Sequence, residues 1–144
     1  MFFLLSTVTA VFASDQLTKW LAIEFLKPRL SVELIPQVFH LSYVENTGIA
    51  FGFFDAHPGW LTIIISISVV CLIAYLPFFA QKSLSKRLAY GFILGGALGN
   101  LVDRFQYHHV IDFLDFRIWP VFNLADSFIT VGVVCFIWFA VKKD

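Results

Sequence analysis

Four long apolar runs constrain this chain more than any other feature of its sequence. They lie at about residues 2–26, 60–80, 84–103 and 124–141. About 20 consecutive, mostly apolar residues are enough for a helix to cross the hydrocarbon core of a bilayer. Only 14% of the residues are charged, 59% are hydrophobic, and the mean hydropathy is +0.82. We therefore predict an all-α membrane protein whose four runs are transmembrane helices of a single integral membrane domain, residues 1–144.

The first and third runs each need a separate argument. The third is the least apolar, but its glycines favour close helix packing inside a membrane. The first run has an alternative interpretation as a cleaved signal peptide, because Val11 and Ala13 fit a small-residue cleavage site. Residues 1–13 contain no basic segment, however, and the apolar pattern resumes beyond Lys19. We therefore favour a retained helix.

The distribution of basic residues predicts the orientation of the helices. The short segment 81–87 contains three basic residues and no acid, and the C-terminus contains Lys142 and Lys143. The much longer segment 27–58 contains two basic residues. Lysine and arginine are enriched in cytoplasmic loops. Both termini are therefore predicted to be cytoplasmic, and the two longer connections, 27–59 and 104–123, are predicted to lie together on the outer side.

The first outer connection is expected to contain β structure. Its residues 38–44 alternate in character, and a turn sequence, Asn46-Thr47-Gly48, precedes three phenylalanines, Phe51, Phe53 and Phe54. This pattern is typical of a small hairpin or short sheet. We expect an extracytoplasmic β cradle at about residues 30–58, with its aromatic side chains on the membrane surface.

Polar residues that are rare in membranes gather near one leaflet in this topology. The third predicted helix ends at an aspartate, the fourth begins near another, and two more lie between them. Burying such groups in lipid costs several kcal/mol unless they pair or reach water, so they indicate a functional site or an internal ion pair. The set consists of Asp103, Asp112, Asp115 and Asp126, with Asn100, Arg104 and Asn123 close to them in sequence.

Two pairs of charged residues are expected to be structural. Asp15 and Lys19 are four residues apart, so they share one face of the first helix. Asp103 and Arg104 are adjacent at the end of the third helix, where an ion pair would order the helix end.

Asp112 and Asp126 have a different setting, because both have mainly apolar neighbours in the sequence. Partial desolvation raises the pKa of a carboxyl group. Two such groups brought close together share one proton, so that one activates a water molecule and the other protonates a peptide carbonyl. Asp115 has a similar setting, and spacing alone does not choose among the three.

Other chemistries fit the sequence less well. There is no His-Glu-x-x-His or Gly-x-Ser-x-Gly motif. His108 and Asp112 could be metal ligands at i and i+4, but interface histidines are the more ordinary interpretation, and we predict no metal site. Cys71 and Cys135 lie in apolar runs and are expected to be buried free thiols. A formal net charge of zero gives no indication of a nucleic-acid partner.

Five sequence blocks together resemble the lipoprotein signal peptidase family, also called signal peptidase II. They occur in the order of the family and span nearly the whole chain, which makes the match specific. The blocks are Asp15-Gln16-Leu17-Thr18-Lys19, Asn46-Thr47-Gly48-Ile49-Ala50-Phe51-Gly52, the segment from Gly95 to Arg104, Val110-Ile111-Asp112-Phe113, and Phe122-Asn123-Leu124-Ala125-Asp126.

The resemblance implies a bacterial aspartic endopeptidase of the cytoplasmic membrane that acts near the outer leaflet. It would cut prolipoproteins immediately before a diacylglyceryl-modified cysteine, as a monomer among membrane lipids, without a cofactor and with sensitivity to the inhibitor globomycin. By motif, Asp112 and Asp126 would be the catalytic pair. The substrate-binding and supporting residues would be Asn46, Gly48, Asn100, Arg104, Asn123, Asp15, Lys19 and Asp103.

One departure from the family pattern and two alternative functions remain at this point. The segment from Asp112 to Asp126 is shorter than is usual for the family, so access or substrate range could differ. The membrane carboxylates would also suit a proton-coupled transporter or channel subunit, which a flux assay in proteoliposomes would test. A non-enzymatic assembly protein held by small-residue packing is the other alternative, and loss of oligomers on mutation of Gly95 or Gly99 would indicate it.

Overall fold

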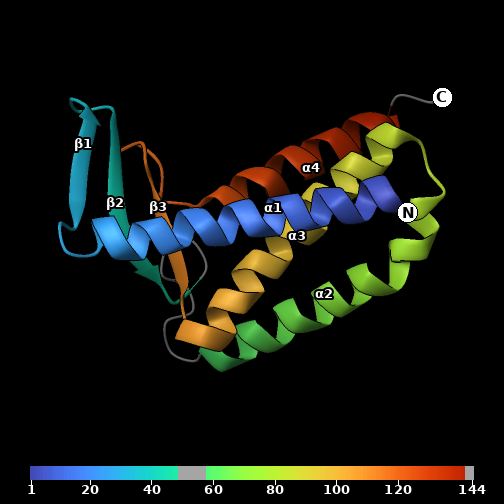
Figure 1. Cartoon of the computed structure of the whole chain (residues 1–144), viewed down its shortest axis with the longest axis horizontal. Helices are drawn as coiled ribbons and strands as arrows, with labels where there is room; N and C mark the ends of the chain where they lie inside the picture. The colour runs from blue at the N-terminus through green and yellow to red at the C-terminus, as the bar shows by residue number, and fades with distance from the viewer. Residues whose placement is uncertain (49–57, 142–144) are drawn as a thin grey trace.

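The computed structural model of the chain describes residues 1–48 and 58–141. All four predicted helices are present in these residues, accompanied by a small sheet (Figure 1). The third helix is one turn longer than expected. In chain order the elements are α1 (Phe2–Leu21), the π-helix η1 (Ala22–Leu26), β1 (Ser31–Ile35), β2 (Phe39–Asn46), α2 (Pro58–Ala80), α3 (Leu84–Tyr107), β3 (Val110–Asp115) and α4 (Leu124–Val141).

Helix α3 packs between α1 and α4 because its glycines let both neighbours approach. A Cβ atom added at Gly95 would lie 2.8 Å from the Cβ of Val11 on α1. One added at Gly96 would lie 2.6 Å from the carbonyl oxygen of Ala125 on α4. Side-chain atoms do not approach this closely without displacement, so the predicted packing role of the α3 glycines is confirmed.

The sheet is antiparallel in the order β1-β2-β3. The turn between β1 and β2 lies at Pro36–Val38, where Gln37 has φ 60° and the Val38 N–H donates to the Ile35 carbonyl at 3.0 Å. The predicted turn at Asn46-Thr47-Gly48 begins where β2 ends, and the second arm of the predicted hairpin lies outside the described residues. Phe51, Phe53 and Phe54, which we expected on the membrane surface, lie outside the described residues.

Strand β3 was not predicted, and it brings Asp112 to the sheet. It pairs with β2 so that Asp112 lies opposite Val44 and Val110 lies opposite Asn46. Almost all of its side chains are buried, so it lacks the alternation that identifies a half-exposed strand. Its partner is also more than 60 residues earlier in the chain, which local patterns do not report.

Among the described residues, one helix has the length and the composition needed to cross a membrane. Residues Gly59–Ala80 are long and apolar enough to cross a membrane, and 6% of their most apolar stretch is buried in the protein. Leu124–Phe139 is a shorter apolar stretch. Helices α1 and α3 carry polar and charged residues that lower their hydropathy, among them Lys19 and Asp103. That all four helices cross a bilayer therefore stays a prediction.

The sheet lies at the end of the helices opposite to both termini, as Figure 1 shows. One hydrophobic cluster fills the helix bundle around Leu94. A second, which includes Leu26, Ile111 and Phe113, packs between η1 and the sheet. The site described next lies where this second cluster meets the helices.

The two cysteines are free, as predicted, but neither is buried inside the protein. Cys71 is exposed on α2 and Cys135 is partly exposed on α4. Helix α2 packs against α3 along one side and leaves the rest of its surface uncovered, so an apolar run in the sequence does not imply burial inside the protein.

Candidate functional site

Asp112 and Asp126 line the same cleft, although one lies on β3 and the other in the first turn of α4. The cleft has a volume of about 420 Å³. Asp112 is buried and Asp126 is half-buried. Four further residues that the sequence singled out also line this cleft: Asn46, Gly48, Asn100 and Arg104.

Two amide side chains connect the two carboxylates. The Asn123 Nδ2 donates to Asp112 Oδ1 at 2.7 Å and to Asn100 Oδ1 at 3.0 Å. The Asn100 Nδ2 in turn donates to Asp126 Oδ1 at 2.7 Å. A continuous path of hydrogen bonds therefore runs from one aspartate to the other and restrains their relative positions.

A capping box at the start of α4 orients Asp126. The Asp126 N–H donates to Asn123 Oδ1 at 2.9 Å, and the Asn123 N–H donates back to Asp126 Oδ2 at 3.2 Å. Such reciprocal bonds satisfy two of the unpaired donors of a helix N-terminus. The positive end of the helix dipole also favours a carboxylate there. Asn123 therefore caps the helix and contacts both aspartates.

Asn46 holds the second oxygen of Asp112. Its Nδ2 donates to Asp112 Oδ2 at 2.8 Å, and its Oδ1 accepts the Gly48 N–H at 3.1 Å. Because β2 and β3 are neighbouring strands and Asn46 lies two residues beyond the partner of Asp112, Asn46 reaches Asp112 diagonally across the sheet. Both oxygens of Asp112 thus accept hydrogen bonds from neutral amides, and among the described residues no cationic side chain forms an ion pair with it.

The surroundings of Asp112 favour its protonated form. Burial raises the pKa of the Asp112 carboxyl from 3.8 to about 7, with the nearby charge of Asp126 adding to the rise. The hydrogen bonds from Asn46 and Asn123 act in the opposite direction but do not offset the burial. At neutral pH this carboxyl can therefore hold or release a proton, as a general acid or base must.

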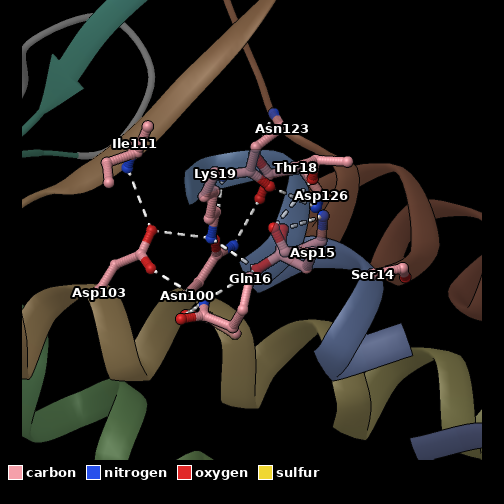
Figure 2. Close-up of polar contacts among 12 residues, drawn as sticks. Ser14, Asp15, Gln16, Thr18, Lys19, Asn100, Asp103, Ile111, Asn123 and Asp126 are labelled. Carbon is pink, nitrogen blue, oxygen red and sulfur yellow. Dashed lines mark hydrogen bonds and ion pairs between the residues drawn. The ribbon is translucent and has the colours of Figure 1, made fainter. Parts of the chain in front are cut away.

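A buried ion triad is formed by Lys19, Asp15 and Asp103 (Figure 2). The Lys19 Nζ lies 2.8 Å from Asp15 Oδ2 and 2.8 Å from Asp103 Oδ2. It also donates to Asn100 Oδ1 at 2.9 Å. The predicted pairing of Asp15 with Lys19 is confirmed, and α3 supplies a second carboxylate to the same cation.

Each acid of the triad also holds the backbone immediately before one of the two aspartates. Asp15 Oδ1 accepts the N–H of Ala125, the residue before Asp126, at 2.9 Å. Asp103 Oδ2 accepts the N–H of Ile111, the residue before Asp112, at 3.1 Å. The triad therefore ties β3 and α4 to the same buried lysine.

The predicted ion pair between Asp103 and Arg104 is wrong. Asp103 pairs with Lys19, while the Arg104 Nη1 donates to the Asn100 carbonyl at 3.1 Å. Adjacent residues on a helix point in different directions, about 100° apart, so they rarely face each other. Arg104 consequently lines the cleft and supplies its positive charge.

Asp115 lies apart from the two aspartates, at the far end of β3. Its carboxylate accepts hydrogen bonds from the Ser42 Oγ at 2.8 Å and from the Arg117 N–H at 2.9 Å. Burial acts to raise its pKa, but these bonds and the Arg117 charge outweigh that effect and the pKa falls below 3.8. It does not line the cleft that holds Asp112 and Asp126.

His108 and Asp112 do not lie on one helix, as a pair of metal ligands at i and i+4 would, because α3 ends at Tyr107 and Val110–Asp115 is a strand. His108 is the left-handed cap of α3, with φ 64°. Within residues 1–48 and 58–141, no group of three or more histidine, cysteine, aspartate and glutamate side chains is arranged to hold a metal ion.

Sequence reasoning missed several residues of this site. Gln16 lies in the same block as Asp15 and Lys19, and its Nε2 donates to Asp103 Oδ1 at 3.1 Å (Figure 2). Its position beside two charged residues was a usable signal. Trp119 and Phe122 form part of the cleft wall. Phe122 opens one of the five sequence blocks, which was a usable signal, whereas nothing in the sequence distinguished Trp119 from the many other aromatic residues.

Comparisons with known proteins agree with one another. Residues 7–142 match the family described as "Signal peptidase (SPase) II". A lipoprotein signal peptidase of Halothermothrix orenii is 43% identical over 134 residues, covering 91% of this chain and 92% of that protein. One of Microcystis aeruginosa is 45% identical over 124 residues, covering 84% and 80%. A solved bacterial membrane enzyme, determined in meso at 2.3 Å resolution, superimposes with a TM-score of 0.86 at 31% identity and covers 96% of this chain and 87% of its own.

Proposed function

Because this chain belongs to the signal peptidase II family, we propose that it is an aspartic endopeptidase of the bacterial cytoplasmic membrane. Its substrates are prolipoproteins that carry a diacylglyceryl group on a cysteine, and it cuts immediately before that cysteine. The observation that carries the aspartic mechanism is the linkage of Asp112 and Asp126 through Asn123 and Asn100 at one cleft.

The two aspartates divide the acid and base work between them. The pair holds one proton, and the raised pKa of Asp112 supports proton exchange at neutral pH. The ionised carboxylate takes a proton from water as the water oxygen attacks the scissile carbonyl carbon. The protonated carboxyl donates to the carbonyl oxygen. A proton then reaches the leaving nitrogen, the C–N bond breaks, and the products are a signal-peptide carboxylate and the free amine of the cysteine.

Arg104 is suited to hold the substrate backbone, and two asparagines orient the catalytic Asp112. Arg104 lines the cleft, and its Nη1 bond to the Asn100 carbonyl leaves further guanidinium N–H groups for substrate carbonyls. Asn46 and Asn123 keep Asp112 oriented while the substrate binds. Positioning of this kind can contribute several kcal/mol to the lowering of the barrier.

The whole chain is proposed to form one integral membrane domain with four spans. The buried triad supports this, because Lys19 neutralises acids of α1 and α3 inside the bundle, where lipid does not meet them. With both termini at the end opposite to the sheet, the basic segment 81–87 would lie in the cytoplasm and the site near the outer leaflet (Figure 1). We expect a monomer that needs no cofactor and is inhibited by globomycin.

Substitution of the aspartates tests the proposal. Asp112→Asn and Asp126→Asn should each lower the rate of cleavage of a diacylglyceryl-modified prolipoprotein by roughly 100-fold or more. Glu24→Gln, which removes an exposed carboxylate of η1, is the matched control and should cleave at the normal rate. A gel-mobility assay of purified enzyme measures all three. Normal cleavage by either aspartate variant would refute the catalytic pair.

A further inference from the structure

The loop from Phe116 to Val121, between β3 and α4, is exposed at its tip and fixed at its base. Ile118 is 95% exposed and Trp119 is 66% exposed. At the base, the Leu114 N–H donates to the Phe122 carbonyl at 2.8 Å, and the Phe122 N–H donates to the Leu114 carbonyl at 3.1 Å. This pair of bonds sets where the loop leaves the sheet and where it returns.

Asp115 fixes the first turn of this loop. Besides the Arg117 N–H, its carboxylate accepts a bond from Arg117 Nη1 at 3.1 Å, and Ser42 joins it to β2. Arg117 has φ 64°, and the Ile118 N–H donates to the Phe116 carbonyl at 2.7 Å. That is a γ-turn with a positive φ, which side chains other than glycine seldom adopt. The Asp115 carboxylate compensates for this conformation by bonding both the backbone and the side chain of Arg117.

An aromatic stack supports the same loop from below. The Phe116 ring lies 4.7 Å from that of Phe39 on β2 and 5.9 Å from that of Phe122, measured between centroids. The Phe116 and Phe122 rings are 10° from parallel. The loop therefore presents Trp119 from a base that is held by backbone bonds, a carboxylate and stacked rings.

Trp119, Phe122 and Asp126 line two neighbouring hollows. One is the cleft of the two aspartates. The other is a groove of about 590 Å³ that also includes Phe122 and follows α4 to Val131. Five residues along a helix span about 7.5 Å, which is enough for several methylene groups. The two hydroxyls of the groove, Ser127 and Thr130, donate to helix carbonyls four residues earlier, so the groove offers few free polar groups.

We propose that Trp119 is a specificity-determining residue of this site, and that the groove beside it binds an acyl chain of the lipidated cysteine. The proposal rests on the proposed function, since a bond cut immediately before that cysteine puts its side chain beside the aspartates. A chain leaving the sulfur then enters an apolar groove that begins at Asp126. Asp115 is a positioning residue, because it acts through Arg117 on the loop that carries Trp119.

The test compares long and short acyl chains on one diacylglyceryl-cysteine peptide. Thr130→Trp fills the groove and should raise KM for the long-chain peptide about tenfold, equivalent to about 1.4 kcal/mol, while leaving the short-chain peptide unchanged. Val134→Trp, four residues further along α4 and outside the groove lining, is the control with no expected effect. An unchanged ratio of long-chain to short-chain KM in Thr130→Trp would refute the proposal that the groove binds an acyl chain.

Asp115→Asn tests the positioning role separately. It should raise KM for the long-chain peptide and leave kcat within about threefold, since the variant retains both catalytic aspartates. Glu33→Gln, which removes an exposed carboxylate of β1, is its control. A fall in kcat for both peptides with no change in chain-length preference would mean that Asp115 has only a structural role.

Fluorescence distinguishes failure of this proposal from failure of the proposed function. A peptide with brominated acyl chains should quench the tryptophan emission of Asp112→Asn, and Trp119→Phe should remove most of that quenching. Quenching without any cleavage by the unsubstituted enzyme would support the groove and refute the peptidase. Cleavage without Trp119-dependent quenching would refute acyl-chain binding in the groove and leave the proposed peptidase function intact.

Discussion

Replacing Lys19 with methionine should destabilise this protein more than any surface charge change. The Lys19 side chain is 2% exposed and lies 2.8 Å from each of two buried carboxylates. Removing one partner of a buried ion pair costs about 3–5 kcal/mol, because it leaves an uncompensated charge in a medium of low dielectric constant. Lys19→Met leaves Asp15 and Asp103 close together with no cation, so the cost should be at least of this size.

The unfolding midpoint of the detergent-solubilised enzyme measures the effect. In a protein of this size, 1 kcal/mol shifts the midpoint by roughly 4 °C, so the expected fall is about 12–20 °C. Lys27→Met is the matched control, since Lys27 also lies near the end of α1 and pairs with Glu45 at 3.0 Å, but both side chains are largely exposed. That variant should unfold at nearly the normal temperature.

A double-mutant cycle identifies the cause of the loss. In an Asp103→Asn background, Lys19→Met should cost less, because one carboxylate fewer remains unpaired. Equal midpoints for Lys19→Met and Lys27→Met would refute the reasoning that the triad stabilises the fold. An undiminished cost in the Asp103→Asn background would show that packing of the lysine stem, and not its charge, is responsible.

Three further predictions follow from the site. Because the pKa of Asp112 is raised from 3.8 to about 7, its contribution to the free energy of unfolding is fully present below pH 3.8 and is lost as pH rises through about 7. Between pH 5 and pH 8 the unfolding midpoint of Asp112→Asn should therefore fall less than that of the unsubstituted protein. Equal falls in the two proteins would contradict this. Asn123→Ala should abolish most cleavage and lower the free energy of unfolding by about 1–2 kcal/mol, because α4 loses its cap. An activity assay and thermal unfolding measure the two effects. Ser83→Ala, at the start of α3 where the cap residue makes no side-chain hydrogen bond, is the control and should change neither. Gly99→Ala would press a Cβ against the Asp15 carboxylate and should cost about 1–3 kcal/mol, whereas Gly59→Ala has open space and should leave the midpoint unchanged or slightly higher.

The positions of the helices could be predicted from sequence because their signal is local. An apolar run of about 20 residues has one stable form in lipid, since a helix satisfies every backbone polar group within the segment. The glycines of α3 likewise indicated close packing, and Gly95 and Gly96 do contact neighbouring helices. The sequence blocks also grouped the residues that line the cleft.

Pairing was predictable within one helix, as for Asp15 and Lys19, but not between charged groups that lie far apart in the sequence. Asp103 was assigned to the adjacent Arg104, yet its cation is Lys19, 84 positions away on another helix. Helix geometry turns neighbours in sequence away from each other, and the approach of α1 to α3 decides which charges meet. Strand β3 was missed for the same reason, since its pairing with β2 depends on residues far from it.

The four apolar runs therefore determined where the helices lie, and the five sequence blocks indicated the family and the residue types of the site. The tertiary structure decided how those residues are connected. It put Lys19 between two acids that hold the backbone before Asp112 and Asp126, and it separated Asp115 from that pair. The physical reason is range: backbone hydrogen bonding and hydropathy act within a segment, whereas the pairing of buried charges depends on which segments the packing of the chain brings together.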